Sequence, residues 1–100
     1  MAIPHIVLYS DANFMGDHTH VFESMSYVGD PFNDATSSFV ILEGQWTFFF
    51  DSNWQTPMAV GRVLGPGRYK FIEDETCLGA GTNDRLSSLR ETSDKEQIQF

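Results

Sequence analysis

The chain has 100 residues, of which 41% are hydrophobic and 14% aromatic, enough to bury one core and no second. Its 14 acidic and 6 basic residues give a net charge of −8, which disfavours nucleic acid and anionic membranes as partners because their phosphates are also negative. The single cysteine, Cys77, excludes an internal disulfide and a multi-cysteine zinc site. We expect a small monomeric domain.

The first residues, Met1-Ala-Ile-Pro-His5, lack the basic and long apolar segments of a signal peptide. No apolar run approaches the roughly 18 residues that a membrane-spanning helix needs. We therefore expect a cytoplasmic protein or a domain of a larger secreted one.

Short runs of β-branched and aromatic residues alternate with clusters of Gly, Pro, Asn, Asp and Ser. This pattern predicts an all-β sandwich or barrel. The predicted strands are 6–9, 21–22, 39–42, 46–50, 61–64 and 69–72. Short helical turns could occupy 25–34 or 73–81, and the polar residues 93–100 are predicted to form a tail.

An internal repeat is the most informative feature. The hexapeptide Asn33-Asp-Ala-Thr-Ser-Ser38 recurs as Asn83-Asp-Arg-Leu-Ser-Ser88, and an aromatic hairpin precedes each copy, at 9–16 and 49–56. Each unit of about 45 residues is too small to bury a face alone, so the two are expected to pack together.

Each hexapeptide, which we call a clamp loop, places carboxylate, amide and hydroxyl oxygens within six residues. Hard cations such as calcium take six to eight oxygen ligands of these kinds. The same residues could instead simply form turns and cap a strand. Two matching copies favour a metal site, and the chain has no EF-hand loop.

These motifs together resemble a known family. Tyr9, Phe14 and Gly16 fit its hairpin pattern, Trp46 stands where its second motif opens, and 64–69 is similar to its tyrosine-corner segment. With both clamp loops, the chain resembles the calcium-binding βγ-crystallin domains of microbes. The resemblance implies two Greek-key motifs in one βγ-crystallin-type sandwich over 1–92, with motif 1 at about 3–43 and motif 2 at about 44–92.

The resemblance also implies two Ca²⁺ sites in a double clamp shared between the motifs. Implied ligands are the side chains of Asp34, Asp84, Ser37 and Ser87, the carbonyls of Ala35 and Arg85, and a carbonyl near Ser10 and near Phe50. Asn33 and Asn83 are interpreted as shaping the loops, with direct ligation open. Ser38 and Ser88 are interpreted as tying down the hairpins.

Two positions depart from the family pattern. Thr56 replaces the glycine of the second hairpin, a position that usually needs a positive φ, and 55–60 is longer than usual, so the hairpin and the carbonyl near Phe50 are expected to be reshaped. Thr36 stands where Leu86 occupies the other loop, so the first loop is expected to pack less tightly.

Other functions are less favoured by the sequence. His18 and His20, with Asp17 beside them, could form a zinc or nickel site, although exposed strand histidines are more common. The aromatic residues could stack on a ligand but are expected mainly in the core: Trp46, Phe48, Phe49, Phe50 and Trp54. No nucleophile motif or phosphate loop is present. We expect a non-enzymatic calcium-binding domain, or alternatively a carbohydrate-binding or protein-binding module such as an enzyme inhibitor.

Overall fold

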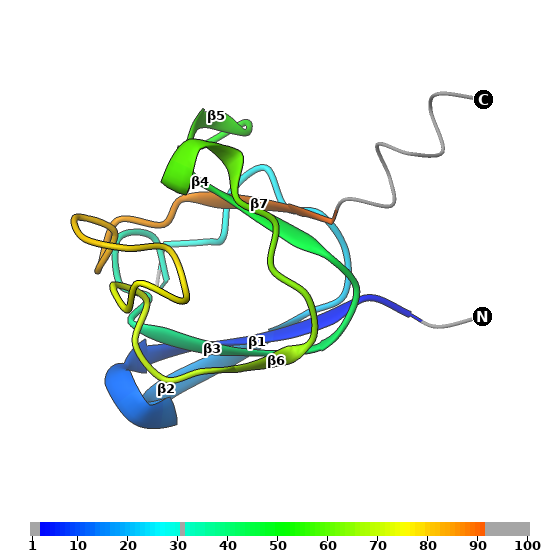
Figure 1. Cartoon of the computed structure of the whole chain (residues 1–100). Coiled ribbons are helices and arrows are strands. Elements are labelled where there is room, and N and C mark those ends of the chain that lie inside the picture. The colour runs from blue at the N-terminus through cyan, green and yellow to red at the C-terminus, as the bar shows by residue number, and fades with distance from the viewer. Residues whose placement is uncertain (1–2, 31, 92–100) are drawn as a thin grey trace.

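The computed structural model describes residues 3–30 and 32–91, which form two antiparallel β-sheets (Figure 1). One sheet has the order β2 (Met15–Val21), β1 (His5–Asp11), β3 (Ser38–Glu43), β6 (Gly67–Tyr69). The other has the order β5 (Gln55–Pro57), β4 (Trp46–Asp51), β7 (Ser88–Glu91). Two 3₁₀ turns, η1 (Ala12–Phe14) and η2 (Met58–Gly61), complete the elements. The predicted all-β fold class is confirmed, and within the described residues no helix is long and apolar enough to cross a membrane.

The two motifs exchange strands between the sheets. The second motif's β6 pairs with β3 of the first motif, with Val40 opposite Arg68. In return, Met25 of the first motif pairs with Leu89 of β7 through backbone hydrogen bonds of 2.9 and 3.2 Å. Each sheet is therefore completed by the other half of the chain, which is the arrangement of two Greek keys packed as one sandwich.

The core fills the space between the sheets. The rings of Phe39 and Phe48, one from each sheet, stack with centroids 4.8 Å apart. Trp46 is fully buried, and its indole N–H donates to the Glu43 carbonyl at 3.0 Å. Of the three consecutive phenylalanines, Phe48 is fully buried, Phe49 is 7% exposed and Phe50 is half-buried. Core packing is therefore confirmed for Trp46 and Phe48, and Phe50 packs against the core from a partly buried position. Phe49 is outside the core cluster, because successive side chains of a strand point to opposite faces.

Several predicted local elements differ from the structure. The strand predicted at 61–64 is wrong, since only Leu64 pairs there, in an isolated bridge with Trp46. The chain turns before it because Ala59 and Val60 both have positive φ, of 49° and 50°. The run 69–72 contributes only Tyr69 to a strand. The described residues of 25–34, which are 25–30 and 32–34, and residues 73–81 contain no helix. The predicted tail lies outside the described residues.

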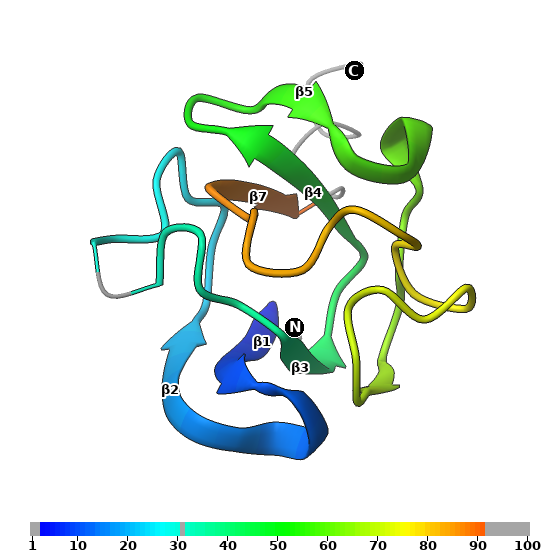
Figure 2. The ribbon, with the colours of Figure 1, turned by 90° about the vertical axis from the view of Figure 1, so that its left-hand side faces the viewer.

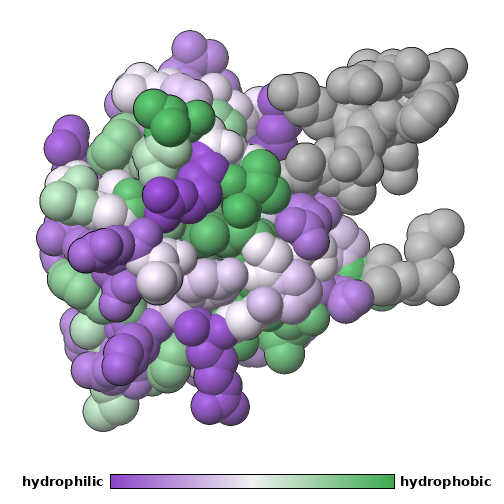
Figure 3. All heavy atoms as spheres, viewed as in Figure 1, coloured by the Kyte–Doolittle hydropathy of each residue, from purple (hydrophilic) through white to green (hydrophobic). Residues whose placement is uncertain are grey.

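The tyrosine corner predicted at 64–69 is present, because the Tyr69 hydroxyl donates to the Gly65 carbonyl at 2.8 Å. On the molecular face of Figure 3, hydrophilic residues surround a smaller group of hydrophobic ones. The two clamp loops lie together at one end of the sandwich, which faces the viewer in Figure 2.

Candidate metal centre

The two clamp loops have the same backbone conformation. Their second residues, Asp34 and Asp84, have positive φ values of 58° and 59°, a region that aspartate tolerates better than most residues. In each loop the third residue closes a turn: Ala35 N–H donates to Phe32 O at 3.1 Å and Arg85 N–H to Thr82 O at 3.2 Å. The repeat seen in the sequence is therefore a repeat of structure.

The loops run past each other and exchange backbone hydrogen bonds. Asp34 N–H donates to the Leu86 carbonyl at 3.0 Å, and Asp84 N–H donates to the Thr36 carbonyl at 3.2 Å. The second residue of each loop is thus fixed beside the fourth residue of the other. Because the ligand-type side chains are neighbours of these residues, the first two residues of each loop are brought to the fifth-position serine of the other.

Side-chain contacts between the loops follow the same exchange. Ser37 Oγ donates to Asp84 Oδ1 at 3.1 Å, and Ser87 Oγ donates to Asn33 Oδ1 at 2.6 Å. The serines are buried, at 7% and 8% exposed, whereas both aspartates are exposed. The structure therefore brings together oxygens that are 47 and 54 residues apart in sequence.

Two groups of residues result, which we call the Asp34 site and the Asp84 site. The Asp34 site comprises Asn33, Asp34, Ser87 and the backbone at Phe50; the Asp84 site comprises Asn83, Asp84, Ser37 and the backbone at Ser10. Phe50 and Ser10 belong to these groups because Ser87 N–H bonds the Phe49 carbonyl at 3.1 Å and Ser37 N–H bonds the Tyr9 carbonyl at 3.0 Å. Phe50 follows Phe49 and Ser10 follows Tyr9, and these are the two residues near which a ligand carbonyl was expected.

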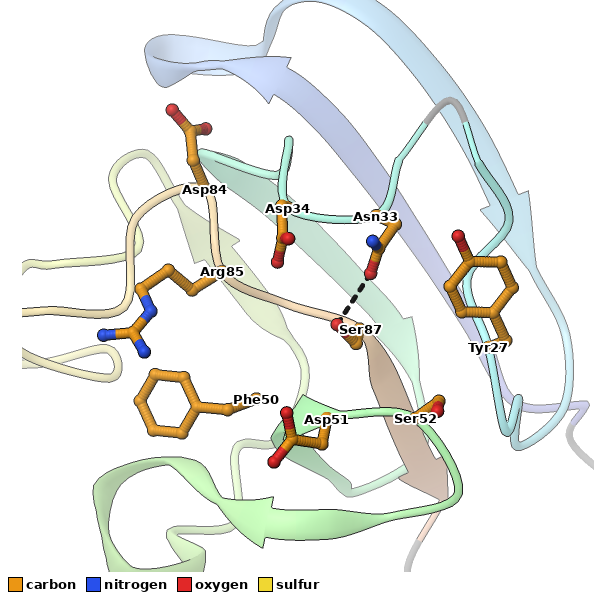
Figure 4. Close-up of a pocket in the computed structure, with 9 residues that line it drawn as sticks. All are labelled: Tyr27, Asn33, Asp34, Phe50, Asp51, Ser52, Asp84, Arg85 and Ser87. Atoms are coloured by element: carbon orange, nitrogen blue, oxygen red, sulfur yellow. Dashed lines mark hydrogen bonds between the residues drawn. The ribbon is translucent and has the colours of Figure 1, made fainter.

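The Asp34 site lies in a hollow of about 510 Å³. In Figure 4 the Asp34 carboxylate points into this hollow, the Asp84 carboxylate points away from it, and Asn33 meets Ser87. The Arg85 guanidinium lies 4.8 Å from the centroid of the Phe50 ring. A cation bound here would therefore share the hollow with the carboxylates of Asp34 and Asp51 and with one guanidinium.

The same hollow is lined by three residues that the sequence patterns did not predict: Tyr27, Asp51 and Ser52. Asp51 is the last residue of β4, and its carboxylate accepts a hydrogen bond of 2.7 Å from the Thr56 hydroxyl. Tyr27 donates to Asp30 at 2.7 Å, and this hydrogen bond raises the pKa of the phenol. Only the position of Asp51, at a strand end beside the hairpin, could have indicated its place from sequence.

The serine at the sixth position of each clamp loop ties down a hairpin, as predicted. Ser38 Oγ donates to the Asp11 carbonyl at 2.6 Å and accepts from Phe14 N–H at 3.0 Å. Ser88 Oγ donates to the Asp51 carbonyl at 2.6 Å and accepts from Trp54 N–H at 3.1 Å. Both serines are fully buried, so their hydroxyls fix the hairpins against the clamp loops.

The second hairpin keeps its fold although it lacks the usual glycine. Thr56 adopts a φ of 57°, close to the 80° of Gly16 in the first hairpin. A left-handed threonine is strained because its branched Cβ crowds the backbone, and its hydrogen bond to Asp51 offsets part of that cost. The hairpin is reshaped after this point, as expected for 55–60: β5 has only three residues, where β2 has seven, and η2 follows it with positive φ at Ala59 and Val60.

The donor atoms of both sites suit a hard cation. They are carboxylate, amide, hydroxyl and backbone oxygens, the ligands that calcium prefers. Asn83 Oδ1 is buried and has no hydrogen-bond partner within the described part of the chain; a buried oxygen in this state is costly, and a cation at the Asp84 site would satisfy it. Among residues 3–30 and 32–91 no group of three or more His, Cys, Asp or Glu could hold a metal, so the candidate ligands are mostly neutral oxygens.

The fold and these loops define the class of protein. The family model for beta/gamma crystallin matches residues 5–92. The chain therefore belongs to the βγ-crystallin family. None of the curated proteins matches the chain.

Solved structures support the same assignment. A βγ-crystallin from an archaeon is 27% identical to this chain and has a TM-score of 0.73. The match covers 90% of this chain and 99% of the archaeal one. One from Ciona intestinalis is 30% identical, with 87% and 98% covered and a TM-score of 0.73. A transition-metal-ion-binding βγ-crystallin from Methanosaeta thermophila is 33% identical, with 85% and 96% covered and a TM-score of 0.68.

Proposed function

We propose that this chain is a non-enzymatic structural domain that binds two calcium ions, one at the Asp34 site and one at the Asp84 site, and is stabilised by them. The observation that carries the proposal is the reciprocal placement of the clamp loops. The serine at the fifth position of each loop donates a hydrogen bond to the first or second residue of the other loop. A turn-forming role would not require two distant loops to present ligand oxygens to each other.

The ligand set predicts moderate affinity. Each site contains one carboxylate from its clamp loops, fewer than strong EF-hand sites have, so dissociation constants on the order of micromolar to hundreds of micromolar are expected. Arg85 lines the hollow of the Asp34 site, and its positive charge opposes a cation there. The Asp51 carboxylate lines the same hollow and attracts the cation, so the charges of these two side chains oppose each other.

Calcium binding should stabilise the fold by linkage. An ion at a hundred times its dissociation constant contributes about 2.7 kcal/mol per independent site, and a domain of this size gains about 4–8 °C in Tm for each kcal/mol. Filling one site should therefore raise Tm by about 10 °C or more. Since each ion would link the two motifs, the gain should affect the whole cooperative unit.

The test is calcium titration by calorimetry on chelator-stripped protein, with melting curves in calcium and in chelator. Two binding events and a higher Tm are expected in the wild type, and both should be lost in Asp34→Ala/Asp84→Ala. The matched control is Glu23→Ala/Glu75→Ala, which removes two exposed carboxylates away from the clamp loops. Absence of binding heat and of a Tm shift in the wild type would refute the proposal.

A second candidate is an interaction module that binds a glycan or a protein. One observation favours it: the outer face of the first sheet has a hollow of about 360 Å³, lined by Val7, Tyr9, Phe14, Val40, Leu42 and Arg68. Leu42 is 51% exposed there. Loss of partner binding in Leu42→Asp, with calcium binding retained, would favour this function over a purely structural one.

A further inference from the structure

All three histidines of the chain lie in a row on the outer face of the first sheet. His18 and His20 are on β2, and His5 is on the neighbouring β1, where Ile6 faces Val21 and Val7 faces His20. Ring centroids are 5.2 Å apart for His5 and His20 and 5.3 Å for His18 and His20. The sequence suggested His18 and His20 as a pair, but the fold adds His5 from the other strand.

The closest approach of imidazole nitrogens is between strands. His5 Nε2 and His20 Nδ1 are 2.9 Å apart on an exposed surface. Two nitrogens bound to one ion at about 2.0–2.1 Å are separated by about 2.9 Å at a right angle and about 3.4 Å at a tetrahedral angle. The two nitrogens are therefore close enough to share one cation once the rings turn so that both lone pairs face it. In contrast, His18 meets His20 edge-on, at an interplanar angle of 79°.

We infer that His5 and His20 form a two-imidazole site for a divalent transition cation such as Ni²⁺, Cu²⁺ or Zn²⁺, separate from the clamp loops. Water would occupy the remaining coordination positions. Imidazole nitrogen suits these cations, whereas calcium takes oxygen ligands. In the neutral pair one ring nitrogen donates its hydrogen to the other. On metal binding that hydrogen moves through solvent to the other nitrogen of the same ring, which leaves two lone pairs for the cation.

The surroundings hold the pair in place. The Phe22 ring stacks on His5 with centroids 4.4 Å apart and an angle of 27°, so it covers one face of that imidazole. The strands that carry the pair are held by antiparallel pairing from Ile6–Val21 to Tyr9–His18. Sites built on paired strands are more precise than sites on loops. The net charge of −8 also favours the approach of a cation.

The test is titration of the full chain with Ni²⁺ by calorimetry in excess calcium and in a non-coordinating buffer. The wild type should bind one Ni²⁺, and His5→Gln and His20→Gln should each weaken binding by about tenfold or more. His18→Gln is the matched control and should leave the dissociation constant unchanged. With Cu²⁺, electron paramagnetic resonance should show coupling to two nitrogens in the wild type and to one in either ligand variant.

Three results would overturn the inference. If His5→Gln bound Ni²⁺ with the affinity of the wild type, the cross-strand pair would not be the site. An equal loss in His18→Gln and His20→Gln would place the cation between the two histidines of β2 instead. Loss of Ni²⁺ binding in Asp34→Ala/Asp84→Ala, with all histidines present, would place it in the clamp loops. Since the histidines are exposed or half-buried, the variants should fold, and circular dichroism melting checks this.

Discussion

Replacing Thr36 by valine should stabilise the protein. Thr36 is fully buried in the first clamp loop, and its hydroxyl has no hydrogen-bond partner within the described residues. An unsatisfied buried polar group costs about 1–3 kcal/mol, and valine has nearly the same shape without the hydroxyl. The backbone carbonyl of Thr36, which accepts from Asp84 N–H at 3.2 Å, is unchanged. We expect Thr36→Val to add about 1–2 kcal/mol to the free energy of unfolding.

The same substitution at Thr82 provides the control. Thr82 is also buried, at 2% exposed, but its hydroxyl donates to the Gly79 carbonyl at 2.7 Å and lies 3.3 Å from the Ile72 carbonyl. Thr82→Val leaves these carbonyls without that donor and should cost about 1–2 kcal/mol. Two equally buried threonines thus give opposite signs, and only the hydrogen bonding of the hydroxyl differs.

Urea denaturation in calcium-free buffer measures both effects. With a slope of about 1 kcal/mol per M of urea for a small domain, the midpoint should rise by about 1–2 M in Thr36→Val and fall by about 1–2 M in Thr82→Val, with unchanged slopes. A fall in the Thr36→Val midpoint would show that the hydroxyl is satisfied in solution, and the reasoning from burial would be refuted.

Three further predictions concern the hairpins, the cysteine and the tyrosine corner. Ser88→Ala removes the hydroxyl that bonds the Asp51 carbonyl and Trp54 N–H and should cost about 2–3 kcal/mol in urea denaturation; a loss no larger than that of the exposed Ser26→Ala would contradict this. Burial raises the pKa of the Cys77 thiol to about 12, so iodoacetamide should alkylate it at pH 8 only through unfolding, and an alkylation rate independent of denaturant would argue against a buried thiol. Tyr69→Phe deletes the 2.8 Å hydrogen bond to the Gly65 carbonyl and should lower stability by about 1 kcal/mol, measured by the shift in urea midpoint; no shift would mean that the corner contributes nothing to stability.

Much of the candidate centre could be predicted because it is encoded locally and twice. Both clamp loops followed from the repeat, and the tie-down role of Ser38 and Ser88 followed from the family resemblance. The structure gives each loop the same turn and each serine an equivalent carbonyl partner. Asp51 was not predicted, because a single aspartate at the end of a strand carries no pattern. Its proximity to the clamp depends on the path of β4 and on the bond from Thr56.

The sequence by itself determined the class of fold. Alternation of apolar residues and turn residues depends on local backbone preference and on burial of one strand face, and both are legible along the chain. The local pattern also overstated one element, since residues 61–64 contribute only an isolated bridge at Leu64.

Tertiary structure alone decided which distant atoms meet. The contacts Ser37–Asp84 and Ser87–Asn33 depend on how the motifs exchange strands, and the pair His5–His20 depends on the register of β1 against β2. Register is set by the fit of whole faces in the core rather than by the residues that finally touch. For that reason His18 and His20 are neighbours in the sequence, whereas in the sheet it is a nitrogen of His5 that meets a nitrogen of His20.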